Sequence, residues 1–221
     1  MKFRALEISG LFLVEPEPFF DARGFFARSW CAKEFNDHGL STDLAQCNIS
    51  YNRKRGTLRG LHYQREPHAE TKLIRCTRGA VFDVAVDLRE NSVTFGHWCA
   101  VELTEKNCAM FYIPAGFAHG FQTLTDGAEL FYQMSCPYQA DRAAGVRYDD
   151  PDLAIRWPLA NPIVAPRDLA LPRLPRRSDR RVPFAESQDS TGAMTTSGKG
   201  GIAPSADIEN SISGRRVGLR Q

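Results

Sequence analysis

The chain has 221 residues, a formal net charge of +2, 43% hydrophobic residues and 24% charged residues. These values are ordinary for a globular protein and suffice for one good core, with little room for a second domain. The small net charge and the scattered arginines argue against a nucleic-acid partner. No apolar run approaches the roughly 18 residues of a membrane span, and the charged segment 1–7 does not resemble a signal peptide, so we expect a cytoplasmic protein without a membrane partner.

The chain contains six cysteines: Cys31, Cys47, Cys76, Cys99, Cys108 and Cys136. An even count permits disulfide bonds, but a chain of this length without a secretion signal needs no such cross-links. We therefore expect reduced thiols in the core. Because no two cysteines have the CxxC spacing, a structural zinc site has no support.

In chain order, the pattern first predicts a helix over residues 32–38, which Gly39 would close. Short apolar runs follow, and turn residues at 78–79 and 105–107 separate several of them. The clearest run alternates, with Val81, Asp83, Ala85 and Asp87 on one face. The predicted strands cover residues 72–76, 80–88, 98–103, 109–114 and 129–134, together with strand-like runs around two histidines. Many short strands at this spacing indicate an all-β sandwich or barrel.

The composition changes near Pro175. The segment that follows has no Trp or Tyr and one Phe, and it is rich in Ser, Gly, Thr and Arg. Such a segment cannot bury enough apolar surface to offset the entropy lost on ordering. We expect one folded domain over residues 1–175 and a disordered, low-complexity tail over residues 176–221, with a docking tail as the alternative.

Two histidines interrupt otherwise apolar segments, His62 in residues 56–64 and His119 in residues 113–121. Buried polar groups are costly unless they are paired, so two such interruptions in one domain indicate a site. In a regular strand Gly60 and Gln64 share a face with His62. We expect the glycine to leave space for a ligand beside the imidazole. The alternative is a core histidine bonded to the backbone, which the presence of a second histidine and nearby cations disfavours.

Other polar side chains suit a reactive, phosphate-binding pocket. Lys72 opens an apolar strand and either reaches water or points inward, where its charge can offset an oxyanion. Tyr132 lies in an apolar strand and needs a partner for its hydroxyl, and the sequence does not separate a core tyrosine from a catalytic one. Arg23 and Arg59 can each grip a phosphate with a planar guanidinium. Without a Walker loop or a GxGxxG motif, phosphate binding would come from side chains.

The segments around the two histidines resemble the two motifs of the cupin superfamily. Metal-binding cupins carry HxH in the first motif, whereas this chain has His62-Tyr63-Gln64. The remaining candidate ligands are His62, His119 and at most Glu70. A transition-metal site needs at least three protein ligands, so this set gives a metal site little support. We expect a pocket without a metal, and a metal-dependent cupin enzyme is the alternative.

Together, the ordered motifs over residues 19–172 resemble the dTDP-4-dehydrorhamnose 3,5-epimerase family. The motifs are FDARGFF at 20–26, QCNIS at 46–50, GTLRGLHYQ at 56–64, KLIR at 72–75, DVAVDLR at 83–89, IPAGFAHGF at 113–121, Tyr132, DDP at 149–151 and WP at 157–158. The resemblance implies a cupin-type jelly roll, or double-stranded β-helix, with short peripheral helices. It also implies a homodimer with strand exchange that uses no cofactor.

The resemblance further implies a nucleotide-linked 4-keto-6-deoxyhexose as substrate. The C4 ketone acidifies the hydrogens on C3 and C5, because removal of either gives an enolate. By the resemblance His62 is the general base, and Asp168 fixes its tautomer and stabilises the imidazolium. Lys72 would face the C4 oxygen, and Tyr132 would return a proton on the opposite face of the ring, which inverts the centre.

The family pattern also assigns residues that hold the substrate. Arg23 and Arg59 would bind the pyrophosphate, and Phe26 would lie against the nucleotide base. In the family, residues such as Arg23 and Phe26 come from a swapped strand of the partner subunit. The remaining expected contacts are Gln46, Asn48, His119, Tyr138 and Arg167.

The chain departs from the family pattern near the substrate. Arg28 and Ala143 stand where the family usually has glutamates, Arg167 where it often has lysine, and Tyr148 where it usually has tryptophan. These changes leave open a CDP-linked in place of a dTDP-linked substrate, and epimerisation at C3 only or C5 only. A non-enzymatic sugar-binding cupin is a further alternative, which the intact pair of His62 and Asp168 argues against.

Overall fold

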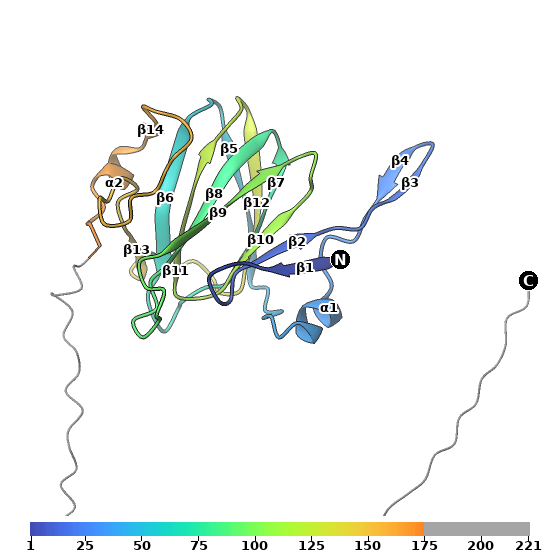
Figure 1. Ribbon diagram of the computed structural model, residues 1–221, viewed down its shortest axis with the longest axis horizontal. Coiled ribbons are helices and arrows are strands. Elements are labelled where there is room, and N and C mark those ends of the chain that lie inside the picture. Colours follow the sequence, from blue (N-terminus) through green and yellow to red (C-terminus); the bar gives the residue numbers. More distant parts are fainter. Residues whose placement is uncertain (175–221) are drawn as a thin grey trace, which may run out of the picture. The chain divides into compact units, whose positions relative to one another are not determined.

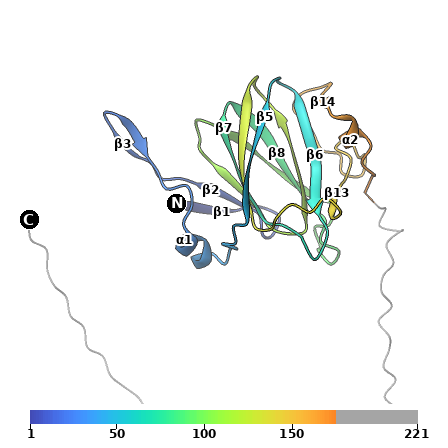
Figure 2. The same cartoon turned by 180° about the vertical axis from the view of Figure 1, so that it is seen from behind.

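The computed structural model describes residues 1–174, which fold into two β-sheets packed face to face (Figure 1, Figure 2). The predicted tail, residues 176–221, lies outside the described residues. The first sheet has the strand order β1-β2-β10-β7-β12-β5. Its strands are β1 (Lys2–Ala5), β2 (Phe12–Glu15), β10 (Met110–Ile113), β7 (Lys72–Arg78), β12 (Ala128–Met134) and β5 (Gln46–Asn52).

The second sheet has the order β13-β6-β11-β8-β9, and β14 pairs in parallel with β6. Its strands are β13 (Ala143–Gly145), β6 (Thr57–Gln64), β11 (Phe117–Thr123), β8 (Ala80–Asp87), β9 (Trp98–Thr104) and β14 (Ile163–Val164). The elements outside the two sheets are the hairpin strands β3 (Phe19–Asp21) and β4 (Gly24–Phe26) and the helices α1 (Ala32–Asp37) and α2 (Pro166–Leu169).

The chain crosses between the sheets at nearly every connection. From β5 to β13, only β8 and β9 are successive strands of the same sheet. This alternation is the jelly-roll topology, so the predicted all-β fold with short peripheral helices is confirmed. The predicted strands at 72–76, 80–88, 98–103, 109–114 and 129–134 correspond to β7, β8, β9, β10 and β12, and the helix predicted at 32–38 is α1.

The apolar faces of the two sheets form the core between them. Ile74, Phe111 and Leu130 come from the first sheet, and Phe117 and Phe121 come from the second. Each is at most 2% exposed. Full burial of one such side chain contributes about 1.5–3 kcal/mol, so this layer holds the sheets at a fixed separation.

The cysteines differ from the expectation in one respect. All six are free thiols, but only Cys76 is buried. The other five lie at partly or fully exposed positions, so most of the thiols are outside the core. No helix within residues 1–174 is long and apolar enough to cross a membrane.

The hairpin of β3 and β4 projects away from the sheets (Figure 1). Its phenylalanines are largely exposed: Phe19 75%, Phe20 75%, Phe25 56% and Phe26 76%. Four exposed aromatic rings on one short hairpin are an unusual apolar surface, of the kind that marks an interaction site.

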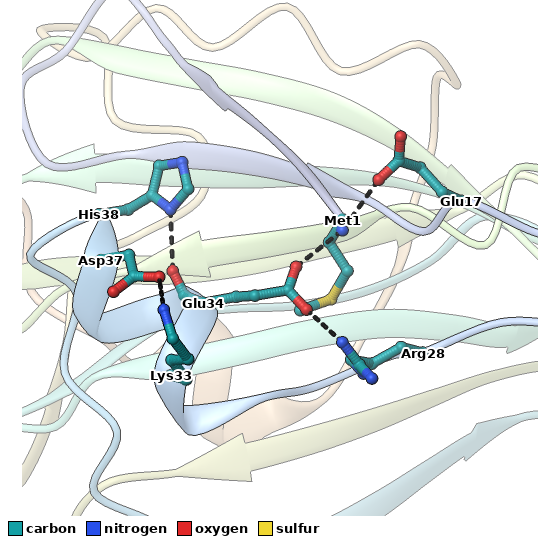
Figure 3. A network of polar contacts seen from close by, with 7 residues as sticks. All are labelled: Met1, Glu17, Arg28, Lys33, Glu34, Asp37 and His38. Atoms are coloured by element: carbon teal, nitrogen blue, oxygen red, sulfur yellow. Dashed lines mark hydrogen bonds and ion pairs between the residues drawn. The ribbon is translucent and has the colours of Figure 1, made fainter. Parts of the chain in front are cut away.

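A polar network fixes the base of this hairpin (Figure 3). The N-terminal amine of Met1 lies 3.0 Å from Glu17, which precedes β3, and 2.8 Å from Glu34 on α1. Arg28, which follows β4, donates to Glu34 across 2.7 Å. Both ends of the hairpin are therefore tied to one carboxylate on α1, whereas its tip is free of the domain.

Asp87, at the end of β8, organises the loop that follows. Its buried carboxylate accepts hydrogen bonds from the Arg89 guanidinium, from Ser92 Oγ at 2.6 Å and from Thr94 Oγ1 at 2.7 Å. Burial alone would raise the pKa of Asp87, but these hydrogen bonds outweigh burial and lower the pKa to about 2. The carboxylate is therefore much more acidic in the folded chain than in the unfolded one.

We expect Asp87→Asn to destabilise the fold in a pH-dependent way. The folded pKa lies below the unfolded one, so the charge stabilises the fold above about pH 4, and this stabilisation is lost as the pH falls toward 2. The free energy of unfolding in urea should fall by about 2 kcal/mol at pH 7 and by roughly half as much at pH 3.

The control is Asp37→Asn, which breaks an exposed pair with Lys33 whose side chains are 54% and 81% exposed. This change should leave the free energy of unfolding nearly unchanged at either pH, because solvent screens an exposed pair. An equal loss for Asp87→Asn at pH 7 and pH 3 would contradict the electrostatic account.

Candidate active site

Two adjoining cavities, of about 640 and 480 Å³, are lined by strands from both sheets. Asn48, His62, Met134 and Arg167 line both, so the two form one continuous space. Of the residues that the sequence predicts for the site, all but Arg23 and Phe26 lie in its wall. They are Gln46, Asn48, Arg59, His62, Lys72, His119, Tyr132, Tyr138, Arg167 and Asp168.

His62 and Asp168 form a hydrogen-bonded pair in the wall. Nε2 of His62 lies 2.9 Å from Oδ1 of Asp168. The imidazole is 39% exposed toward the cavity side, whereas the carboxylate is 3% exposed. Burial lowers the pKa of His62 below its ordinary value, although the charge of Asp168 opposes this effect. At neutral pH the imidazole is thus uncharged and able to accept a proton.

The last segment of the domain brings Asp168 to this position. β14 pairs with the start of β6, and α2 follows immediately with Pro166 as its first residue. The second oxygen of Asp168 accepts a hydrogen bond from the backbone N–H of Gly60 at 3.2 Å. The carboxylate is therefore held by β6 itself, two residues before the histidine that it contacts.

A bulge in β6 brings Arg59 and His62 into one cavity. Residues three apart on a regular strand point to opposite faces. Here His62 pairs with His119 and Arg59 pairs with Phe121, so β6 has one residue more than β11 over this stretch. Such a bulge re-aims side chains. Both Arg59 and His62 consequently line the smaller cavity.

Gly60 has a different role from the one expected. A Cβ at Gly60 would lie 2.5 Å from Cα of Gly120 and 2.9 Å from the carbonyl oxygen of His119, and the glycine has φ +125°. The expectation that Gly60 leaves space for a ligand is therefore wrong. The missing side chain allows β11 to approach β6 closely.

Tyr132 faces the cavity from the opposite sheet. It lies on β12, its ring meets the ring of His119 edge-on at 5.9 Å, and its hydroxyl has no hydrogen-bond partner among residues 1–174. Burial raises the pKa of Tyr132 well above its ordinary value, and the nearby charge of Asp83 adds to this. The hydroxyl is therefore protonated over the usual pH range and can donate to a bound molecule.

His119 is held by a carboxylate that sequence reasoning did not include in the site. Nε2 of His119 lies 2.8 Å from Oδ1 of Asp83, and both side chains are almost fully buried. Oδ2 of Asp83 is buried without a partner in the described part of the chain. Burial raises the pKa of Asp83, against the opposing effect of His119. The signal in the sequence was an acidic residue on the inward face of the apolar strand 80–88.

The cations of the site are oriented by neighbouring polar groups. Nε of Arg59 donates to Asn52 across 2.8 Å, and the terminal nitrogens have no partner in the described residues, so they are available to an anion. Lys72 points inward and bonds to the buried carboxylate of Glu70. Burial lowers the pKa of Lys72, whereas the charge of Glu70 raises it. Arg167 is 76% exposed and lies 3.4 Å from Asp168.

The rim of the larger cavity is formed partly by Gln46 and Tyr138. The side-chain oxygen of Gln46 accepts a hydrogen bond from the backbone N–H of Tyr138 at 2.7 Å. Tyr138 is 62% exposed. Ala143, where the resemblance led us to expect a glutamate, also lines this cavity.

Arg23 and Phe26 are not part of the cavity wall of their own chain. Both lie on the projecting hairpin, where Arg23 is paired with Asp21 at 2.6 Å and Phe26 is 76% exposed. The guanidinium is 90% exposed.

The donor groups of the site are spread out. Within residues 1–174, no group of three or more His, Cys, Asp or Glu side chains is arranged to hold a metal ion. The site thus combines an imidazole–carboxylate pair, a facing phenol, a buried ammonium and two arginines around one cavity.

The comparisons with known proteins agree with this site. The family model described as dTDP-4-dehydrorhamnose 3,5-epimerase matches residues 5–176. A dTDP-4-dehydrorhamnose 3,5-epimerase from Sinorhizobium fredii is 42% identical over 175 residues, which cover 79% of this chain and 90% of the relative.

Two solved structures have the same fold and related sequences. The dTDP-4-dehydrorhamnose 3,5-epimerase from Bacillus anthracis, with TDP and PPi bound, is 41% identical with a TM-score of 0.77, over 78% of this chain and 99% of that one. The 3,5-epimerase from Legionella pneumophila, in complex with dTDP-4-keto-L-rhamnose, is 38% identical with a TM-score of 0.73, over 79% and 99%. The chain therefore belongs to the dTDP-4-dehydrorhamnose 3,5-epimerase family.

Proposed function

We propose that this protein epimerises a dTDP-linked 4-keto-6-deoxyhexose at C3 and C5, in the manner of dTDP-4-dehydrorhamnose formation. The observation that carries the proposal is the position of His62 and Tyr132 on facing sheets around one cavity. Inversion of a carbon centre needs a base on one face of the sugar ring and an acid on the other. The complexes of the Bacillus and Legionella relatives support the nucleotide and the sugar.

In this proposal His62 removes the hydrogen from C3 or C5. Nε2 is engaged by Asp168, so Nδ1 accepts the proton, and the carboxylate stabilises the imidazolium that forms. The electrons of the C–H bond move into the ring and give an enolate with its negative charge on the C4 oxygen. Lys72 faces that oxygen and offsets the charge.

Tyr132 completes the inversion. Its hydroxyl gives a proton to the carbon from the face opposite His62, and the C4 ketone forms again. The raised pKa of Tyr132, caused mainly by burial, keeps this hydroxyl protonated until the enolate forms. Proton exchange with solvent then returns both residues to their starting states.

The proposal includes a homodimer in which the hairpin of one subunit completes the site of the other. Arg23 and Phe26 are remote from the cavity of their own chain, and four phenylalanines on this hairpin are exposed. In the partner's site Arg23 would join Arg59 at the pyrophosphate, and Phe26 would lie on the base. Six free thiols suit a reducing compartment, so we place the enzyme in the cytoplasm.

The number of inverted centres is tested by proton NMR in deuterium oxide with dTDP-4-keto-6-deoxyglucose. We expect the C3 and C5 hydrogens to be replaced by deuterium. Loss of only the C3 or only the C5 proton signal would show that the enzyme acts at a single centre. The alanine at position 143, where the family usually has glutamate, leaves this outcome open. If neither signal is lost, the same measurement is made with the CDP-linked sugar, and exchange there would replace dTDP by CDP in the proposal. Absence of exchange with both sugars would overturn the proposal.

We expect His62→Asn to abolish this exchange and Asp168→Asn to slow it by roughly 10²–10⁴-fold, because the carboxylate orients the base and stabilises its charged form. Wild-type exchange should also decline as the pH falls below the lowered pKa of His62, which burial causes. In Asp168→Asn this decline should begin at lower pH, since a charge that raises the pKa is lost. His97→Asn, an exposed histidine outside the cavities, is the control and should exchange normally.

Tyr132→Phe should separate exchange from inversion. His62 can still remove the hydrogen and return deuterium to the same face, so we expect deuterium incorporation without the epimerised product. NMR of the recovered sugar distinguishes the two stereoisomers. Full epimerisation by Tyr132→Phe would remove the phenol from the mechanism.

Mixing two inactive variants tests the exchanged hairpin. Refolded together, His62→Asn and Arg23→Glu should regain activity, because a heterodimer then has one site with an intact His62 and an intact Arg23 from the other chain. If each hairpin served its own chain, no site in the mixture would be complete. Absence of recovery, with heterodimers present, would therefore contradict strand exchange.

A further inference from the structure

Glu70 and Lys72 form a buried ion pair at the junction of the two cavities. Glu70 precedes β7 and lines the larger cavity, whereas Lys72 begins β7 and lines the smaller one. The side chain of Glu70 is 8% exposed and that of Lys72 is 7% exposed. Taking two charges out of water costs several kcal/mol per ion, so such a pair needs mutual compensation.

Each of these charges has the other as its hydrogen-bond partner. Nζ of Lys72 donates to Oε1 of Glu70, and no other side-chain hydrogen bond reaches either group from residues 1–174. An ammonium has three N–H donors, and Glu70 takes one. Because Lys72 lines the cavity, the other two are available to an oxygen bound there.

The rest of the cavity does not supply a second negative charge to Lys72. The titratable groups that share the smaller cavity with it are Tyr51, Arg59, His62, His119, Tyr132 and Arg167. The other two carboxylates of the site are paired with histidines, Asp168 with His62 and Asp83 with His119. Glu70 is accordingly the group whose charge raises the pKa of Lys72 against the lowering effect of burial.

We propose that Glu70 is a positioning residue for the epimerase reaction, which holds the Lys72 ammonium in its charged form and aims it at the C4 oxygen of the substrate. This inference rests on the proposed function. Without Glu70 the ammonium would be desolvated in a cavity that two arginines also line, and it would release its proton to solvent at lower pH. A neutral amine donates a weaker hydrogen bond to the enolate and does not offset its charge.

Glu70→Gln tests this inference, since it keeps the shape of the side chain and removes its charge. We measure deuterium incorporation at C3 and C5 from pH 6 to pH 9. The rate of the variant relative to the wild type should fall as the pH rises, because its alkaline decline should begin at least about one pH unit earlier, which gives roughly tenfold slower exchange on that limb. Parallel pH profiles of the variant and the wild type would overturn the inference.

Two controls separate this role from a general effect on structure. Glu66→Gln removes an exposed carboxylate on the same segment and should leave the pH profile unchanged. Lys72→Met removes the titrating group, so adding Glu70→Gln in that background should leave the pH dependence of the residual exchange unchanged, because Glu70 acts through the lysine. A shift that persists in that background would show that Glu70 acts by another route.

A direct titration of Lys72 keeps the inference independent of activity. With ¹³C at the lysine Cε, the signal that Lys72→Met removes should titrate at lower pH in Glu70→Gln than in the wild type. An unchanged midpoint overturns the inference even if the enzyme is active. Absence of exchange by the wild type on any substrate overturns the proposed function but leaves this titration valid.

Glu70→Asp provides a second variant if Glu70→Gln does not fold. It retains the charge but shortens the side chain by one methylene, so the alkaline limb should stay within about half a pH unit of the wild type while the rate falls. If the alkaline decline of Glu70→Asp were displaced by a full pH unit from that of the wild type, a role based on the charge of Glu70 would be contradicted.

Discussion

The close approach of β6 and β11 is the constraint on which the site depends. A Cβ at Gly60 would lie 2.5 Å from Gly120, and a Cβ at Gly120 would lie 2.7 Å from the carbonyl oxygen of Arg59, so both positions require glycine. The bulge at this contact lets Arg59 and His62 share a cavity. It also presents the N–H of Gly60 to Asp168. One backbone contact thus orients the arginine, the base and the partner of the base.

The jelly roll explains why the reactive groups face one another. Its successive strands alternate between sheets, so His62 on β6 and Tyr132 on β12 enter the same space from opposite sides. The pKa of each is shifted mainly by burial, downward for the imidazole and upward for the phenol. Both shifts favour the uncharged form, and they give a ready base and a ready acid at neutral pH.

The sequence predicted those features that depend on local pattern. Alternation along residues 80–88 predicted β8, and apolar runs predicted the neighbouring strands of the core. The bulge at Gly60 could not be predicted in this way, because it follows from a contact with β11, which comes about sixty positions later. Asp168 lies 106 positions from His62, so no spacing rule connects the two residues. Only the family resemblance predicted that they form a pair. Asp83 was placed on the same face of its strand as Val81 and Ala85, but its bond to His119 depends on the register of β8 and β11.

The hairpin of β3 and β4 connects the chemistry of the site to its assembly. Its base is fixed by Glu34, whereas Arg23 near the turn and the phenylalanine rings of its two strands have no contact that buries them in their own chain. The Arg23 guanidinium is paired with Asp21 and, at 90% exposure, is accessible to a phosphate. In the proposed dimer, burial of these rings against the partner would supply the energy of association and would bring a second arginine to the pyrophosphate. Binding of the nucleotide and pairing of the subunits would then stabilise each other, because both use the same hairpin.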